Sequence, residues 1–435
     1  MSEQHAIMRT CRSICLYLVT VAGALCSAGQ ESFDTNINPA LLYYQAFLVA
    51  PEPLPQSEWD YLSSYEGRSQ PLPARYAGIV AGYDNQFRLV RQAAQATAPC
   101  DWGTDLSAGP ATLLPQLAPA KEVMVATRLR LAWDLQHGRQ AEACDDLLAA
   151  ITLARSLPRN GLLISLLVQI AMESIGCYMV AENFYQFSPE ALQQLAAGLE
   201  ATPPRGTVAG CVPGEKALSQ HWMLRRIEEL QRANPADDAK VMAEIRKLFA
   251  LVFDELDREG LGEKAQEAPW WERVVRAAGG TSEGVVKLIH DLEPFNQKLA
   301  GVLALPYGEY QQQMKQLKAE TQQSANPLPG LGLAFWENSR DREFKGLVNL
   351  ALLRAALEYK LHGQSGLQSV ADPCGQGPLG FRRFIFQGVD RGFELKSACP
   401  LNPWPYVMIF VEKEGPPFYT DGRYAGQARP RTEPK

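Results

Sequence analysis

The chain has 435 residues, of which 46% are hydrophobic and 21% charged, and its formal net charge is -6. This is the composition of a globular protein with enough chain to bury a large core. The sequence contains neither a basic block nor a sustained run of Lys and Arg that could follow a phosphate backbone, so we expect no nucleic-acid partner.

The first 28 residues are typical of a secretory signal peptide. Arg9 and Arg12 precede an apolar run at residues 13–25, and small residues follow it. Cleavage after Ala28 would place Cys26 and Ala28 at the positions that the signal peptidase recognises. We therefore expect an exported protein of the periplasm, the cell envelope or the extracellular space. If this segment stays uncleaved, it is the expected membrane contact.

Six cysteines remain after this segment, and an even number in an oxidising compartment permits disulfide bonds. Cys144 and Cys177 lie at similar distances from a predicted turn at 158–161, so an antiparallel helix pair would bring them to similar heights. Cys374 and Cys399 flank a predicted β segment. The alternative is that several cysteines are buried thiols. Without a CxxC pair or closely spaced histidines, we expect no metal site and no cofactor.

Helices are predicted along most of the chain. Asn38 and Pro39 supply the cap and first turn of one helix, and apolar residues at every third or fourth position indicate a long helix at 73–97. Further on, short turns force neighbouring helices to pack antiparallel. These helices are expected at residues 121–136, 140–157, 162–184 and 188–199.

Residues 162–184 are apolar at nearly every position, which predicts either a central core helix or a membrane span. The polar residues Ser165, Gln169 and Glu173 are four apart and share one face. Gln169 and Glu173 would be costly near the centre of a bilayer, so the core helix is favoured. We expect the polar stripe to line a binding groove.

Proline and glycine at 203–206 mark the clearest predicted boundary, after which the chain becomes more charged. Trp270 and Trp271 are expected to fill a contact between helices. Further helices are expected at 216–232, 239–258, 282–303, 307–323 and 339–361, with a flexible break at 327–332. The predicted divisions are the signal peptide at 1–28, an N-terminal helical domain at 29–202, a second helical region at 207–363, a β appendage at 364–415 and a disordered tail at 416–435.

Near the C-terminus, short β-type runs at 381–386, 393–397 and 406–411 predict an antiparallel meander. The expected fold class is therefore mainly α, an antiparallel helical-hairpin array with a small C-terminal β meander.

Three resemblances accompany this pattern. The stretch GRQAEACDDLLAAITLARSL resembles the first helix of a tetratricopeptide-type repeat. The whole chain also resembles a group of exported bacterial helical proteins that has no activity to carry over, through its exported start, NPALLYYQAFLVAP, CDWG, the hairpin series and the Asp-Pro-x-Gly end. The end of the chain resembles the periplasmic part of type II secretion pseudopilins. The matching residues are Tyr359, Gly363, Asp372, Pro373, Gly375, Pro378, Gly392, Phe393, Leu395 and Ser397.

This third resemblance covers about 60 residues. The prepilin N-terminus and the calcium-loop tail of the pseudopilins are missing, so it implies neither pilus assembly nor calcium binding.

Two stretches carry candidate chemistry. Residues 280–284 fit the G-x-S-x-G pattern of a nucleophile elbow, which needs a strand before the serine. The preceding residues predict a helix instead, so we expect Ser282 to be a helix N-cap. Glu173 is the candidate general acid, because a carboxyl group in apolar surroundings can serve as a proton donor.

Glu173 and Ser174 resemble the Glu-Ser pair of lytic transglycosylases, although the Gly-Leu-Met-Gln stretch of that family is absent. The alternative for Glu173 is a structural ion pair with Arg128 or Arg130 of the preceding helix, or a position at the solvent edge of the stack. The neighbouring acids Asp145 and Asp146 are expected on a solvated helix face.

The leading expectation is a non-enzymatic exported envelope scaffold or protein-interaction protein, with an envelope or secreted protein as its partner. It rests on the stacked hairpins and on the lack of a complete catalytic motif. The alternative is an envelope glycan-cleaving enzyme that uses Glu173 as general acid. Small-ligand binding within the helical array is a third possibility.

Overall fold

The computed structural model describes residues 36–52, 54–64, 71–258, 270–400 and 406–415. The predicted signal peptide and the predicted tail at 416–435 lie outside these ranges. The described chain is mainly helical and carries a small three-stranded antiparallel sheet near the C-terminus, which confirms the predicted fold class.

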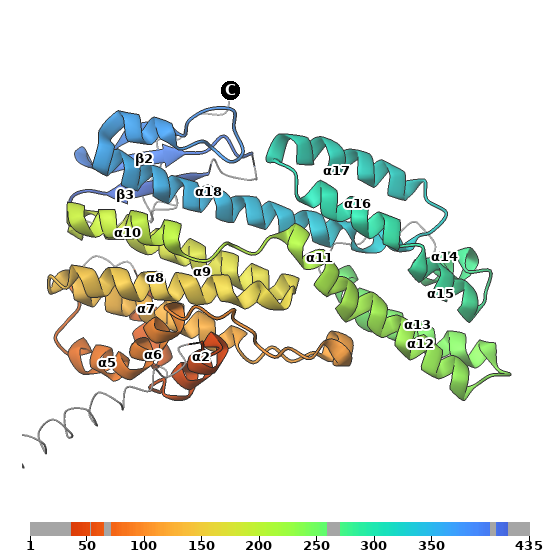
Figure 1. Ribbon diagram of the computed structural model, residues 1–435. Coiled ribbons are helices and arrows are strands. Elements are labelled where there is room, and N and C mark those ends of the chain that lie inside the picture. The colour runs from red at the N-terminus through yellow and green to blue at the C-terminus, as the bar shows by residue number, and fades with distance from the viewer. Residues whose placement is uncertain (1–35, 53, 65–70, 259–269, 401–405, 416–435) are drawn as a thin grey trace, which may run out of the picture.

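The N-terminal half is a layered stack of helices (Figure 1). Asn38 and Ser188 cap their helices by accepting hydrogen bonds from Ala40 N and Ala191 N, as the sequence predicts. The helix expected at 73–97 is divided into two helices that meet at Tyr83. The N-terminal stack consists of α2 (Pro39–Leu48), α3 (Gln56–Ser63), α5 (Tyr76–Gly82), α6 (Asp84–Ala94), η1 (Leu106–Ala111), α7 (Leu117–Gln136), α8 (Gln140–Ser156), η2 (Leu157–Asn160), α9 (Leu163–Glu182), η3 (Phe184–Gln186) and α10 (Pro189–Ala201).

Helix α9 lies at the centre of the molecule, where it packs against α7, α8, η2, strand β3 and the long helix α18. Among the described residues, it is the helix with the length and apolar composition of a membrane span, and 67% of its most apolar window is buried inside the protein. Neighbouring helices therefore cover most of the surface that a bilayer would otherwise cover.

The second half forms an arm that extends away from the stack (Figure 1). Phe249 of α13 packs against both Trp270 and Trp271 of α14, with ring centroids 6.0 and 5.7 Å apart, so the tryptophans fill a helix contact as expected. The C-terminal arm consists of α11 (Val208–Lys216), the π-helical turn η4 (Ala217–His221), α12 (Trp222–Ala233), α13 (Asp238–Arg258), α14 (Trp270–Ala277), α15 (Ser282–His290), α16 (Glu293–Leu303) and α17 (Tyr307–Gln322).

Helix α18 (Leu328–Ser369) runs along both halves. Leu328 packs with the core of α12 to α15, Phe344 packs with α11, α16 and α17, and Leu352 packs with the N-terminal stack. The flexible break expected at 327–332 is wrong. Pro329 occupies the first turn of α18, where its missing N–H group costs no hydrogen bond, so these residues begin the helix.

The sheet follows α18. Strands β1 (Gly380–Phe386), β2 (Val389–Lys396) and β3 (Val407–Val411) are antiparallel in the order β1-β2-β3, which confirms the predicted meander. Phe393 and Phe410 pack edge-on against Phe184 in η3, so one face of the sheet continues the core of the stack.

Candidate functional site

The polar stripe of α9 does not line an open groove, and this prediction is corrected. Ser165, Gln169 and Glu173 all have an exposed fraction of 0%. Sequence spacing shows that they share a face, but it does not show which way the face points. In the structure it faces α8 and the chain segment after α10.

Glu173 is held by two guanidinium groups. Arg155 Nε donates to its Oε1 and Arg205 Nε to its Oε2, each at 2.8 Å. Gln169 Nε2 donates to the same Oε2 at 3.1 Å. Both carboxylate oxygens are therefore occupied, and no substrate reaches them in this conformation. The geometry gives no support to a general-acid role for Glu173.

The partners expected for Glu173 are wrong, because Arg155 of α8 and Arg205 occupy its two carboxylate oxygens. Arg128 forms an ion pair with Glu182, and Arg130 forms one with Asp146. The structural ion pair expected as the alternative is thus present, but with different arginines.

Residues 203–206, where the sequence predicts a boundary, are hydrogen-bonded to the N-terminal stack. Pro203 O accepts a hydrogen bond from Arg155 Nη1 at 3.0 Å, and Gly206 N donates to Gln169 Oε1 at the same distance. A Cβ atom on Gly206 would lie 2.6 Å from Pro158 Cγ, so the close approach requires glycine. The polar stripe therefore joins the N-terminal stack to the segment that leads into the second half, and the division of the chain into two regions at this point stays a prediction.

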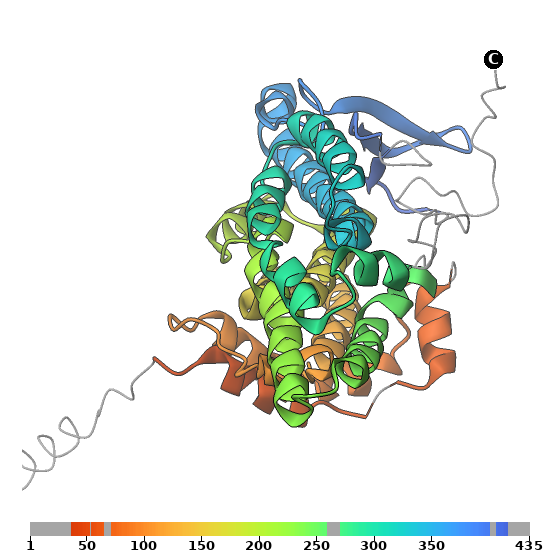
Figure 2. The same cartoon turned by 90° about the vertical axis from the view of Figure 1, so that its right-hand side faces the viewer.

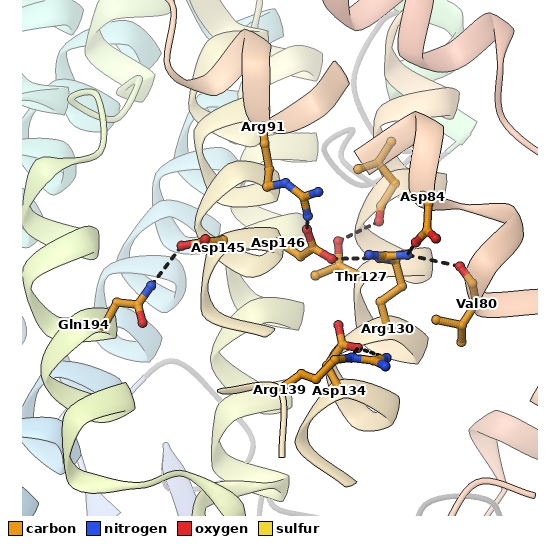
Figure 3. Close-up of polar contacts among 11 residues, drawn as sticks. Val80, Asp84, Arg91, Thr127, Arg130, Asp134, Arg139, Asp145, Asp146 and Gln194 are labelled. Atoms are coloured by element: carbon orange, nitrogen blue, oxygen red, sulfur yellow. Dashed lines mark hydrogen bonds and ion pairs between the residues drawn. The ribbon is translucent and has the colours of Figure 1, made fainter. Parts of the chain in front are cut away.

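A second buried network centres on Asp146 (Figure 3). Arg130 Nε donates to Asp146 Oδ2 at 2.7 Å, and Arg91 forms an ion pair with the other oxygen. Arg130 also donates to Asp84 at 2.7 Å, so the network joins α6, α7 and α8. Burial raises the pKa of Asp146, and the guanidinium groups oppose this shift. The solvated position expected for the two acids is right for Asp145 and wrong for Asp146.

Ser282 is a buried structural residue. The helix cap is Thr281, whose hydroxyl accepts from Gly284 N at 3.1 Å, so the cap expected at Ser282 lies one residue earlier. The Ser282 hydroxyl donates to Asp238 of α13 and accepts from Gln231 Nε2 of α12 at 2.8 Å. A turn after α14 precedes it instead of a strand, so the geometry is not that of a nucleophile elbow.

The cysteines in the described ranges form no disulfide bonds in the structure. Cys144 Sγ donates to the carbonyl of Ala191 in α10 at 3.6 Å, and burial raises the pKa of this thiol to about 12. Burial also raises the pKa of Cys177. A bond between these two cysteines stays a prediction. No group of three or more His, Cys, Asp or Glu side chains in the described ranges is placed to hold a metal ion.

An open pocket of about 420 Å³ lies beside the stack, where sequence reasoning had indicated no site. We call it the α3–α7 pocket. Its walls come from α3, from the second half of α7, from the segment around η3 and from Glu414. The lining residues are Trp59, Leu62, Pro71, Leu72, Val125, Arg128, Leu129, Ala132, Leu135, Gln136, Glu182, Asn183, Tyr185, Gln186 and Glu414.

The α3–α7 pocket combines aromatic, amide and charged groups. Tyr185 is 39% exposed, and burial together with the nearby Glu414 carboxylate raises its pKa. Arg128 and Glu182 form an ion pair in the wall and remain partly exposed. In the sequence, Trp59 lies in a short predicted helix and Tyr185 follows α9, but their spacing does not predict that they line the same pocket.

The fold and the pocket define a mainly α protein with a buried polar interior and an aromatic-lined recess beside the N-terminal stack. No protein-family model, no curated protein and no solved structure matches this chain.

Proposed function

We propose that this protein is a non-enzymatic, exported interaction protein that binds an envelope or secreted partner protein at the α3–α7 pocket. The observation that carries the proposal is the grouping of Trp59, Tyr185 and Arg128 around one recess. Trp, Tyr and Arg are the residues that contribute most to binding energy at protein interfaces, and they act from desolvated pockets.

The walls also favour a specific interaction. The Arg128–Glu182 ion pair remains partly exposed in the wall and offers a charged donor and a charged acceptor to a peptide group. Apolar side chains from α7 line part of the pocket, which suits an inserted apolar side chain of the partner. Export rests on the signal-peptide pattern of the first 28 residues.

Photo-crosslinking in the source cell tests this proposal. A photo-reactive amino acid replaces Gln136, which is exposed at the pocket, and in a control replaces Lys315, which is exposed on α17. We expect one exported protein to be crosslinked from position 136 and not from position 315. The same products from both positions, or none from position 136, would count against the pocket as an interface.

The volume of the pocket favours a second candidate, the binding of a small molecule. About 420 Å³ falls within the range of about 300–1,000 Å³ that small-molecule sites occupy. A thermal-shift screen of glycan fragments and short peptides separates the two candidates. A fragment that raises the Tm of the wild type but not of Tyr185→Ala would favour a small ligand over a protein partner.

A further inference from the structure

We propose that Cys374 and Cys399 form a disulfide bond that closes the loop between the end of α18 and the end of β2. This inference is independent of the function proposed above. It rests on the arrangement of the two segments that carry these cysteines.

One carboxylate anchors both segments. Asp372 is 6% exposed, and its Oδ1 accepts from Cys374 N at 3.0 Å and from Ser397 Oγ at 2.7 Å. Its Oδ2 accepts from Ala398 N at 2.6 Å. Ser397 Oγ in turn accepts from Cys399 N at 3.0 Å. The backbones of both cysteines are thus fixed to a single Asp372–Ser397 unit.

The thiols themselves are neighbours. The side chain of Cys399 is a hydrogen-bond partner of Cys374, and this contact together with burial raises the pKa of Cys374. Cys374 is half-buried and Cys399 is buried, so an oxidant reaches Cys374 first. A disulfide forms readily only where the two backbones already lie close, and the shared anchor supplies this condition.

A metal ion is the other ligand that paired thiols attract. Structural zinc sites use four ligands, and no group of three or more His, Cys, Asp or Glu side chains is suitably placed in the part of the chain that the structure describes. The oxygens of Asp372 are already occupied by N–H and O–H donors. The pair is therefore suited to oxidation.

The oxidant is a low-molecular-weight disulfide or a dithiol oxidase. The small fraction of Cys374 that is thiolate, which the raised pKa keeps low, attacks one sulfur of that disulfide, forms a mixed disulfide and releases one thiol. The Cys399 thiolate then attacks Cys374 Sγ, which forms the Cys374–Cys399 bond and releases the second thiol. The two cysteines lose two electrons and two protons, and the oxidant gains both.

Peptide mapping tests the inference directly. The purified full chain is incubated with oxidised glutathione, remaining thiols are alkylated, and the digest is analysed by mass spectrometry with and without reductant. We expect one linked peptide that contains Cys374 and Cys399 and that disappears on reduction. Recovery of both cysteines as separate alkylated or glutathionylated peptides, or linked to other cysteines, would overturn the proposal.

Thermal unfolding supplies a second readout. Closing a loop of about 25 residues should raise the Tm of the oxidised wild type by about 5 °C over the reduced protein. Cys399→Ser should abolish this difference, whereas Cys100→Ser should retain it. An oxidised-minus-reduced difference that persists in Cys399→Ser would assign the effect to another pair.

Discussion

Buried charges set the orientation of single residues in this protein. Glu173, Asp146 and Glu343 are buried carboxylates, and each is bonded to at least one guanidinium group. Such pairs add little net stability, because desolvation offsets their attraction, but breaking one leaves an uncompensated charge. Turning a face of α7, α8 or α9 away from its neighbour would break the Arg130–Asp146 or Arg155–Glu173 pair, whereas Arg340 and Glu343 both lie in α18.

Glu173→Gln tests this role. The substitution keeps the size of the side chain but leaves the Arg155 and Arg205 guanidinium groups without their counter-charge. We expect a loss of about 3 kcal/mol in the free energy of unfolding. Urea unfolding measures it, with Glu229→Gln in an exposed ion pair as the control that leaves stability unchanged. Equal stability of Glu173→Gln and wild type would show that this charge is dispensable.

Replacement by alanine is expected to change the stability of the protein in opposite directions at two glycines. Gly206→Ala places a methyl group 2.6 Å from Pro158 Cγ, so we expect it to destabilise the protein by about 1–3 kcal/mol. Gly301 lies inside α16 with nothing within 4 Å of an added Cβ, and Gly301→Ala should stabilise by about 0.5–1 kcal/mol. The denaturant midpoints of both variants, compared with that of the wild type, test these two expectations. A Gly206→Ala protein as stable as the wild type would mean that residues 203–206 pack loosely against Pro158.

At the scale of elements, local sequence patterns predict that a helix or strand is present better than they predict the residues at which it begins and ends. The predicted β runs and the helices at 121–136, 140–157 and 188–199 agree with β1 to β3 and with α7, α8 and α10 to within a few residues. Proline and glycine at 327–332 predict a break because they interrupt a helix when they lie inside it. The first turn of a helix tolerates proline, so α18 begins at these residues instead.

The candidate site shows a different limit. Residue spacing predicts the polar stripe on α9. Burial of that face depends on the packing of α8 and of residues 203–206 against it, and no local sequence pattern predicts this packing. The α3–α7 pocket is assembled from segments as distant in sequence as Trp59 and Glu414. Neither feature could be predicted from one sequence, because both depend on tertiary packing.

The sheet carries an acid-sensitive contact. Arg383 of β1 donates to Asp390 and to Glu412 at 2.7 Å, and Lys360 of α18 donates to Glu412 at 2.9 Å. The Arg383 guanidinium lowers the pKa of Asp390. Burial opposes the ionisation of Glu412, but Lys360 and Arg383 outweigh it and lower its pKa.

Both carboxyls thus have folded-state pKa values below their unfolded ones. Their contribution to stability is present above the unfolded pKa, about 4, and is lost as the pH falls through the folded value. We expect Arg383→Gln to lower the Tm at pH 7 and to lower it less at pH 3. Arg354→Gln, in an exposed pair with Glu200, is the control that should show no such change. An effect of Arg383→Gln that is equal at both pH values would contradict this assignment.

At the scale of the whole molecule, α18 connects parts of the chain that are far apart in sequence. Figure 1 shows the sheet and the α12–α13 region at opposite ends of the molecule, and Figure 2 shows the C-terminal arm in front of the N-terminal stack. Side chains of α18 enter three separate apolar clusters. Stability of the arm and of the sheet therefore depends on one helix.

The lining of the α3–α7 pocket includes none of the three residues of the buried polar stripe. Alanine variants in the pocket should consequently reduce binding without unfolding the protein, because Trp59 is half-buried and Tyr185 is exposed. Circular dichroism and Tm of each variant provide the check on folding.

Crosslinking yield in the source cell, from a photo-reactive residue at position 136, tests the central claim most directly. It is compared among the wild type, Trp59→Ala and a control, Ile385→Ala, whose side chain is 57% exposed on β1. We predict that Trp59→Ala reduces partner capture about tenfold or more, as expected for a residue that dominates an interface, and that Ile385→Ala does not. Unchanged capture by a folded Trp59→Ala protein would contradict the proposal that the α3–α7 pocket is the binding site.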